Sequence, residues 1–211
     1  MENGFFITLE GGEGAGKSTQ LQRLGKALTQ AGHRVVLTRE PGGAPGAEAV
    51  RELLVTGEPG RWSPLAEALL FAAARDEHLR ATIRPALAAG AVVVSDRFAD
   101  STRAYQGAGG GLEAGIVDAL EHWVVGPTVP HLTIILDLDP VAGLDRTGRR
   151  GGGSDRFERH GADFHARLRE AFLDIATADP GRCVVVDAAR PEDVVAGEIA
   201  RLALARLAAK R

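Results

Sequence analysis

The sequence has little of several features on which whole classes of proteins depend. Its 211 residues include one cysteine, Cys183, which excludes an internal disulfide and fits a reducing compartment. The formal net charge of -3 excludes the broad positive surface that binds a nucleic acid polymer. No segment holds the roughly 18 consecutive apolar residues of a membrane span, and the chain does not begin like a signal peptide. We therefore expect a cytoplasmic protein that binds no nucleic acid polymer and no membrane.

The sequence also has few lysines, and its histidines lack the spacing that is typical of a metal site. The lysines are Lys17, Lys26 and Lys210, and none lies in the Asn-Lys-x-Asp element with which GTPases read guanine. The six histidines show no His-Glu-x-x-His or comparable spacing, so no site for a metal ion held by the protein alone is predicted. The missing Asn-Lys-x-Asp element excludes a GTPase switch.

Short apolar segments rich in β-branched residues alternate with longer stretches of helical periodicity. The five expected strands are Phe5–Leu9, Arg34–Leu37, Ala91–Ser95, Leu132–Leu138 and Cys183–Val186. Some are apolar at nearly every position, as in parallel strands covered by helices on both faces. Stretches rich in glycine at residues 41–46, 107–111 and 148–153 are expected to be loops. The pattern predicts one three-layer α/β domain over residues 1–211, with a five-stranded parallel sheet flanked by helices.

The first expected strand runs directly into the pattern G-x-x-x-x-G-K-[ST]. The predicted phosphate loop consists of Gly11, Gly12, Glu13, Gly14, Ala15, Gly16, Lys17 and Ser18, continuing into Thr19 and a helical pattern. Its glycines let successive backbone N–H groups point at phosphate oxygens, and the following helix adds its positive end. Lys17 is expected to reach the β- and γ-phosphates of ATP, and Ser18 its Mg²⁺.

The third expected strand ends in Ser95, Asp96 and Arg97. A carboxylate at Asp96 can hold Mg²⁺ through water, and the Arg97 guanidinium can grip the phosphate of an acceptor. This pair favours phosphoryl transfer between two nucleotides, although a salt-bridged strand end has the same residues. A kinase for another nucleotide or nucleoside, and a regulatory ATPase, stay open as alternatives at this point.

Five segments together resemble the thymidylate kinase family, whose members move the γ-phosphate of ATP to dTMP. They are FITLEGGEGAGKST (Phe6–Thr19), TREPGG (Thr38–Gly43), FAAARDEH (Phe71–His78), SDRFADSTRAYQG (Ser95–Gly107) and LDRTGRR followed by DRFE (Leu144–Glu158). The resemblance extends over nearly the whole chain. It implies a P-loop NTPase fold, ATP with Mg²⁺ as donor, dTMP as acceptor, dTDP and ADP as products, and a homodimer.

The resemblance also implies a pocket for dTMP. Its residues would be Glu13, Arg51, Phe71, Arg75, Arg97, Ser101, Thr102, Tyr105 and Gln106. Arg97 and Arg51 would hold the phosphate, and Glu13 would lie near the 3′-hydroxyl. Phe71 would stack on thymine, with Arg75 donating to its O4. Because arginine carries only donors, it suits this carbonyl and is mismatched to the 4-amino group of cytosine.

The other pocket residues surround the sugar and the base edge in the family. Thr102 and Gln106 would lie near the edge of the base, and Tyr105 would crowd the 2′ position of the sugar. Tyr105 is the one tyrosine of the chain, and an aromatic residue that completes the core is the alternative interpretation.

Arginines gather around Gly151–Gly153, at Arg146, Arg149, Arg150, Arg156 and Arg159. A solvated basic helix end would show the same run, and ion pairs that anchor the lid helix would explain Arg156 equally well. We expect a short mobile lid at about residues 146–158 whose positive charge stabilises the transferred phosphoryl group. The resemblance implies the subtype with lid arginines, since Gly14 occupies the position of a catalytic arginine in the other subtype. Arg150 is the preferred contact, followed by Arg149 and then Arg146. Lys17 and Arg97 complete the predicted catalytic set.

Overall fold

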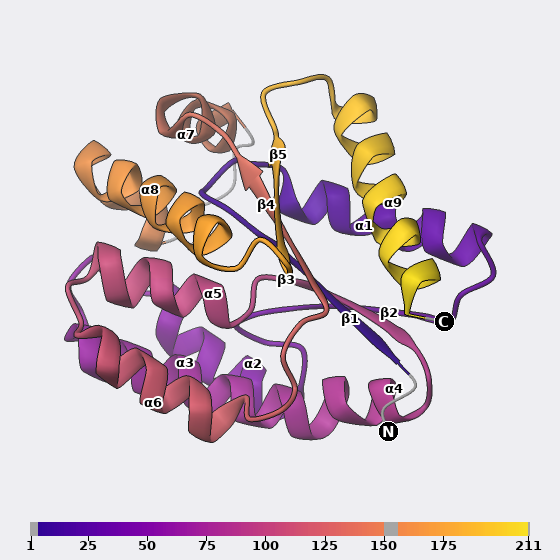
Figure 1. Cartoon of the computed structure of the whole chain (residues 1–211). Coiled ribbons are helices and arrows are strands. Elements are labelled where there is room, and N and C mark those ends of the chain that lie inside the picture. Colours follow the sequence, from indigo (N-terminus) through magenta and orange to yellow (C-terminus); the bar gives the residue numbers. More distant parts are fainter. Residues whose placement is uncertain (1–3, 150–155, 211) are drawn as a thin grey trace.

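The protein, seen here as a computed structural model that describes residues 4–149 and 156–210, is built on a five-stranded parallel sheet (Figure 1). Its strands are β1 (Phe5–Glu10), β2 (Val35–Arg39), β3 (Val92–Asp96), β4 (Leu132–Asp137) and β5 (Cys183–Asp187). They lie in the order β2-β3-β1-β4-β5, and each neighbouring pair is parallel. The predicted fold class and all five predicted strands are confirmed.

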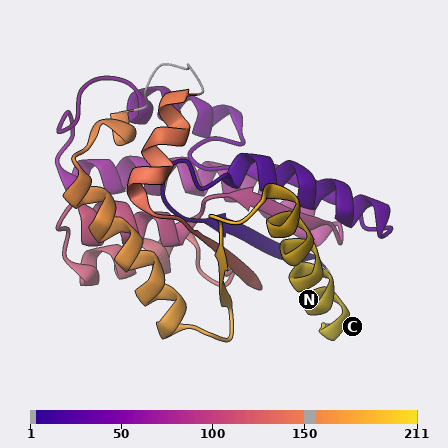
Figure 2. The same ribbon diagram turned by 90° about the horizontal axis from the view of Figure 1, so that it is seen from above.

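Helices cover both faces of this sheet (Figure 2). The α-helices are α1 (Lys17–Gln30), α2 (Pro45–Val55), α3 (Pro64–His78), α4 (Arg84–Ala88), α5 (Ala99–Thr102), α6 (Ala114–Val124), α7 (Pro140–Arg149), α8 (Ala162–Ala178) and α9 (Glu192–Ala209). The π-helices η1 (Leu79–Ile83) and η2 (Arg103–Gly109) and the 3₁₀-helix η3 (Arg156–Arg159) complete the described elements.

The strands are apolar on both faces because alternate side chains enter different clusters. Ile7 and Val94 pack in one cluster with the apolar side chains of α1 and α9. Phe6 and Val93 point the other way, into a cluster with residues of η1 and α4. Farther along that face, Ile135 packs against residues of η2 and α8. This two-sided burial explains the nearly continuous apolar runs of the sequence.

The described parts of all three glycine-rich stretches include helical residues. Helix α2 already begins at Pro45, whose fixed φ suits the first helical turn. Residues 107–109 belong to η2, where a Cβ on Gly109 would lie 2.7 Å from Cε2 of Phe164. Glycine is therefore needed there for the close approach of α8. The expectation of a loop was wrong for residues 107–109, which are helical, and correct for Gly110 and Gly111, which form a turn. In the third stretch Gly148 and Arg149 belong to α7, and residues 150–153 lie outside the described residues.

The carboxyl ends of the first three strands lie together. In the parallel register both Leu9 of β1 and Arg39 of β2 pair with Asp96 of β3. The segments that follow these strands therefore leave the sheet at the same edge. Open α/β sheets bind their ligands at this edge.

Candidate active site

The segment between β1 and α1 has the geometry of a phosphate loop. Gly11, Gly14 and Gly16 have φ values of 131°, 69° and 90°, which side chains disfavour. Lys17 begins α1, and its Nζ donates to the carbonyl oxygens of Gly12 at 2.8 Å and Gly11 at 3.1 Å. Burial and the nearby charge of Arg97 lower the pKa of Lys17 to about 8. The cation is thus folded over the loop, at the N-terminus of a helix that attracts anions.

Ser18 and Asp96 meet at the base of this loop. The Ser18 hydroxyl, at the start of α1, donates to Oδ2 of Asp96, at the end of β3, over 2.7 Å. Hydroxyl and carboxylate oxygens are hard ligands of the kind that Mg²⁺ prefers, so the predicted pair fits this ion. Within residues 4–149 and 156–210, no three His, Cys, Asp or Glu side chains gather in a way that could hold a metal ion.

Arg97 connects the phosphate loop to the next part of the site. Its Nη2 donates to Oε1 of Glu13 at 2.8 Å and to Oη of Tyr105 at 2.7 Å. Its Nη1 donates to the carbonyl of Gly11 at 3.0 Å and to Oγ of Ser101 at 3.2 Å. Burial would raise the pKa of Glu13, but the charges of Arg97 and Lys17 outweigh it and lower this pKa to about 2. Glu13 is therefore an anion that orients Arg97.

The backbone of Arg97 is itself unusual. Its φ of 69° lies in the left-handed region, the single such case among the described residues other than glycine. The Arg97 N–H donates to the carbonyl of Leu9 at 2.9 Å, and the Ser95 hydroxyl donates to the Arg97 carbonyl at 2.7 Å. A backbone conformation of this kind costs about 1–3 kcal/mol and is found most often at functional sites.

Sequence reasoning missed Glu10, a fully buried carboxyl group at the end of β1. Its Oε1 accepts from the backbone N–H of Phe98 at 2.7 Å, and its Oε2 accepts from the Ser101 hydroxyl at 2.6 Å. Burial, with Asp100 nearby, raises the pKa of Glu10 to about 8. Glu10 thus fixes the turn that carries Arg97. The available signal was a glutamate at the end of an otherwise apolar strand, where an unpaired carboxyl is costly.

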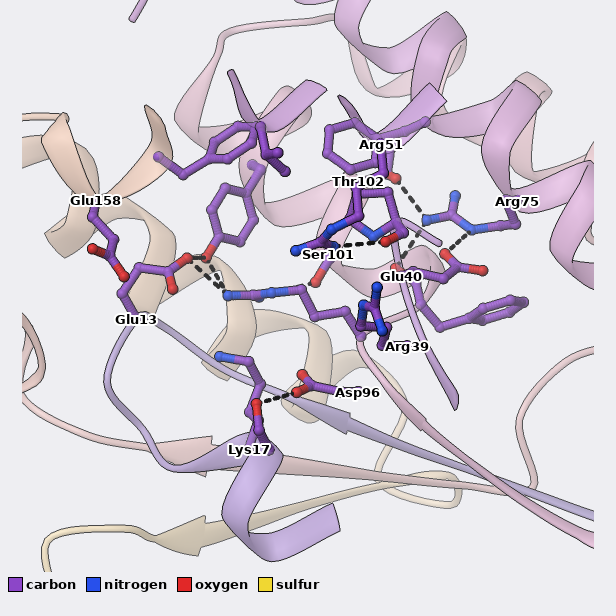
Figure 3. A pocket seen from close by; sticks show the side chains of 18 of the residues that line it. Glu13, Lys17, Arg39, Glu40, Arg51, Arg75, Asp96, Ser101, Thr102 and Glu158 are labelled. Atoms are coloured by element: carbon purple, nitrogen blue, oxygen red, sulfur yellow. Dashed lines mark hydrogen bonds and ion pairs between the residues drawn. The ribbon is translucent and has the colours of Figure 1, made fainter. Parts of the chain in front are cut away.

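One cavity of about 240 Å³ joins the phosphate loop to the predicted dTMP residues (Figure 3). From the loop it is lined by Glu13, Gly14, Gly16, Lys17, Ser18 and Thr19. Its remaining predicted residues are Arg51, Phe71, Arg75, Asp96, Arg97, Ser101, Thr102, Tyr105 and Gln106. The structure therefore brings every predicted dTMP residue into one cavity. It adds Arg39, Glu40, Pro41, Val55, Phe98, Phe157 and Glu158, which sequence reasoning had not assigned to the pocket.

A second cavity lies on another side of the phosphate loop. Its lining combines Gly14–Gly16, Thr19 and Gln20 with Arg146, Arg149 and the segment around Ala188–Glu192. Helix α7 passes so close to the loop that a Cβ on Gly14 would lie 2.0 Å from the carbonyl oxygen of Gly143. Two predicted lid arginines, Arg146 and Arg149, therefore lie beside the loop. Arg150, the preferred candidate, is outside the described residues.

Arg156 and Arg159, two of the arginines predicted around the glycine run, make contacts with the segments around α2 and α3. Arg156 is 1% exposed, donates from Nε to the carbonyl of Leu54 at 3.0 Å and forms an ion pair with Glu67. Glu67 in turn accepts from Gln106 at 2.8 Å. Arg159 pairs with Glu58. These contacts anchor η3 to the segments around α2 and α3, so an anchoring role explains both arginines.

Known proteins resemble this chain in sequence and in fold over nearly its full length. Residues 9–199 match the sequence model of the thymidylate kinase family. The thymidylate kinase of Caulobacter vibrioides is 58% identical, over 98% of this chain and 99% of that protein. The thymidylate kinase of Dinoroseobacter shibae is 52% identical, over 93% and 94%. The crystal structure of thymidylate kinase from Ehrlichia chaffeensis superposes with a TM-score of 0.77 at 34% identity, over 94% and 98%. The chain therefore belongs to the thymidylate kinase family.

Proposed function

We propose that this chain phosphorylates dTMP, transferring the γ-phosphate of ATP to give dTDP and ADP for dTTP synthesis. The observation that carries this proposal is the single cavity lined by Lys17 of the phosphate loop and by Phe71 and Arg75. A nucleoside monophosphate held there faces the donor phosphates directly. Transfer in line then needs no covalent phospho-enzyme, because both substrates are held in reacting positions. Membership of the thymidylate kinase family supports the same reaction.

The phosphate loop and the end of β3 hold the donor. Backbone N–H groups of the loop and the first turn of α1 bind the phosphate oxygens, and Lys17 exchanges its carbonyl partners for the β- and γ-phosphates. Ser18 and Asp96, whose side chains meet at the base of the loop, would hold Mg²⁺ with the donor. When bound, this ion neutralises charge on the phosphate oxygens.

Arg97 and Arg51 hold the phosphate of the acceptor. Arg97 lies between Glu13 of the loop and Tyr105 of η2, so its guanidinium is already directed at the boundary between the two nucleotides. Arg51 is positioned from α2, where its Nη1 donates to the carbonyl of Pro41 at 2.7 Å. Two guanidinium groups offer planar sets of donors that match phosphate oxygens.

The far end of the cavity recognises thymine and deoxyribose. Phe71 offers a half-buried ring for stacking, and Arg75 donates to O4 of the base. The Tyr105 ring is packed against Phe157, with centroids 5.6 Å apart, and its hydroxyl donates to Glu13 at 2.6 Å. This fixed ring occupies the space that a 2′-hydroxyl needs, which favours a deoxyribonucleotide.

The lid at about residues 146–158 supplies the remaining charge for transfer. We assign the contact with the transferred group to Arg150, followed by Arg149 and then Arg146; the last two lie beside the loop. Positive groups at this point stabilise the negative charge on the transferred phosphoryl group, and closure over it excludes water that would hydrolyse ATP.

The resemblance to the family supports a single domain over residues 1–211 that works as a homodimer in the cytoplasm. Within the part of the chain that the structure describes, no helix has both the length and the apolar character of a membrane span. Size-exclusion chromatography with light scattering tests the dimer: a mass of about twice 22.1 kDa is expected.

ADP release in the presence of ATP and one acceptor at a time tests the reaction. The acceptors are dTMP, dUMP, dCMP, dGMP and thymidine. We expect the greatest stimulation by dTMP and almost none by dCMP. Stronger stimulation by thymidine would indicate a nucleoside kinase. ADP release at the same rate with and without every acceptor would indicate a regulatory ATPase.

A further inference from the structure

Two of the three side-chain nitrogens of Arg75, Nε and Nη2, donate hydrogen bonds to neighbouring residues. Its Nε donates to Oε2 of Glu40 at 2.7 Å, and its Nη2 donates to the Phe98 carbonyl at 3.0 Å and to Oγ1 of Thr102 at 3.1 Å. No described residue accepts a hydrogen bond from Nη1. Since Arg75 lines the acceptor cavity, the N–H groups of Nη1 are the ones left to meet a ligand.

Glu40 is the strongest of these restraints, and a second chain of hydrogen bonds holds Glu40 in turn. Its other oxygen, Oε1, lies 3.0 Å from Nδ1 of His78, and Nε2 of His78 lies 2.6 Å from Oγ1 of Thr38. With Nδ1–H donated to Glu40, Nε2 is left to accept the Thr38 hydroxyl proton. Glu40 and His78 are 6% and 0% exposed, so water does not compete for these bonds.

The TREPGG loop closes tightly over this chain of hydrogen bonds. A Cβ on Gly43 would lie 2.4 Å from both Nε2 of His78 and Oγ1 of Thr38, and φ at Gly43 is 82°. The Gly43 carbonyl accepts from the Thr82 hydroxyl at 2.7 Å. Only glycine permits this contact, which leaves the His78 ring no room to rotate.

We propose that Glu40 and His78 are positioning residues that set the preference of the acceptor site for a 4-oxo over a 4-amino pyrimidine. This inference rests on the proposed function. Figure 3 shows Arg75 beside Glu40 and Thr102, and the Phe98 carbonyl is its third partner. A guanidinium held in this way cannot turn away from a bound base. A carbonyl at C4 accepts its free N–H, whereas an amino group places donor against donor and leaves both unsatisfied. Once Glu40 no longer holds it, Arg75 can swing aside and the penalty for the amino group falls.

The test measures wild type and variants with two acceptors, dTMP and 5-methyl-dCMP. These differ only at C4 of the base, which carries an oxo or an amino group, and in the hydrogen on the adjacent ring nitrogen. The measured quantity is the ratio of kcat/KM for dTMP to that for 5-methyl-dCMP. We expect Glu40→Leu, which removes both acceptor oxygens, and His78→Leu to lower this ratio by about tenfold or more. His78→Asn, which can still present a donor near the Nδ1 position, should recover part of it. Asp76→Asn is the matched control, because Asp76 is exposed on α3, the helix that also carries Arg75 and His78. This variant should keep the wild-type ratio.

The ratio separates positioning from stability. A purely structural role would lower the melting temperature and reduce kcat/KM for both substrates by the same factor, and an unchanged ratio in Glu40→Leu and His78→Leu would overturn the proposal. If either variant fails to fold, Thr38→Val tests the outer end of the chain by the same ratio. Failure of the proposed function would look different, since wild-type protein would then release no extra ADP with dTMP.

Discussion

Nη2 of Arg97 lies 2.8 Å from Oε1 of Glu13, which joins the end of β3 to the phosphate loop. The two side chains are 15% and 19% exposed, so solvent weakens their attraction only in part. The group assigned to the acceptor phosphate is thus in direct contact with the loop assigned to the donor. Binding at either half of the cavity therefore acts on the same ion pair.

Replacing Arg97 by alanine should weaken binding of dTMP by about 10- to 100-fold, because a hydrogen bond to a charged group contributes about 1.5–3 kcal/mol. Thymidine, which lacks the phosphate, should lose much less affinity. Calorimetric titration with the two ligands makes the comparison. Equal losses for both would mean that Arg97 shapes the pocket and does not grip the phosphate.

Replacing Arg150 by alanine should lower kcat by about 10²–10³-fold, because removal of one group that stabilises the transferred charge has an effect of this size. The KM for dTMP should change little, since the acceptor is held by other residues. Arg149→Ala, measured in the same assay, shows which of the two arginines makes the contact. Arg201→Ala, an exposed position on α9, is the control for loss of positive charge. Unchanged kcat in both lid variants would remove the lid from the transfer step.

Most of the fold, and the residues that line the cavity, were predictable because the sequence patterns that indicate them are local. The phosphate loop has fixed spacing, and the strands are continuous apolar runs that end in Glu10, Arg39 and Asp96. In a parallel sheet these ends meet at one edge, which brings the motifs that follow them together. The lining of the cavity follows from this rule and from the resemblance to the family.

The supporting residues were missed because their partners are distant in sequence. Glu10 bonds to Phe98 across 88 positions, and Arg75 bonds to Glu40 across 35. Periodicity describes which face a residue occupies and carries no information on such pairings. Arg156 illustrates a related difficulty. In a glycine-rich, basic stretch the sequence alone does not distinguish a buried arginine that anchors a segment from a solvent-exposed arginine of a lid.

The raised pKa of Glu10 predicts how stability depends on pH. Between the ordinary value of 4.5 and about 8, the folded chain keeps a proton on this carboxyl that the unfolded chain has lost. The folded state then binds more protons, so the contribution of Glu10 to stability is complete below about pH 4.5 and is lost as the pH rises through 8. Urea denaturation at several pH values from about 5 to 9 should show this decline in wild type.

Glu10→Gln should be less sensitive to pH over the same range, because glutamine has no proton to lose. Glu113→Gln, at an exposed position, should keep the slope of wild type. A Glu10→Gln variant with the wild-type slope would show that another group causes the decline.

The lid region offers a contrast between two arginines of the same short helix, η3. Arg156 is 1% exposed and pairs with Glu67, which is 13% exposed, whereas Arg159 and its partner Glu58 are 36% and 82% exposed. Arg156→Ala leaves a largely buried carboxylate without its cation and should lower the free energy of unfolding by about 3–5 kcal/mol. Arg159→Ala breaks a pair screened by water and should lower it by about 1 kcal/mol or less.

Urea denaturation of both variants measures these changes, and kcat at saturating ATP and dTMP separates the two possible roles of Arg156. If Arg156 is an anchor, its replacement lowers the free energy of unfolding, and any loss of kcat follows from the displacement of η3. The anchoring role is wrong if Arg156→Ala unfolds at the same urea concentration as wild type while kcat falls by orders of magnitude, since that combination is the property of a group that contacts the transferred phosphate.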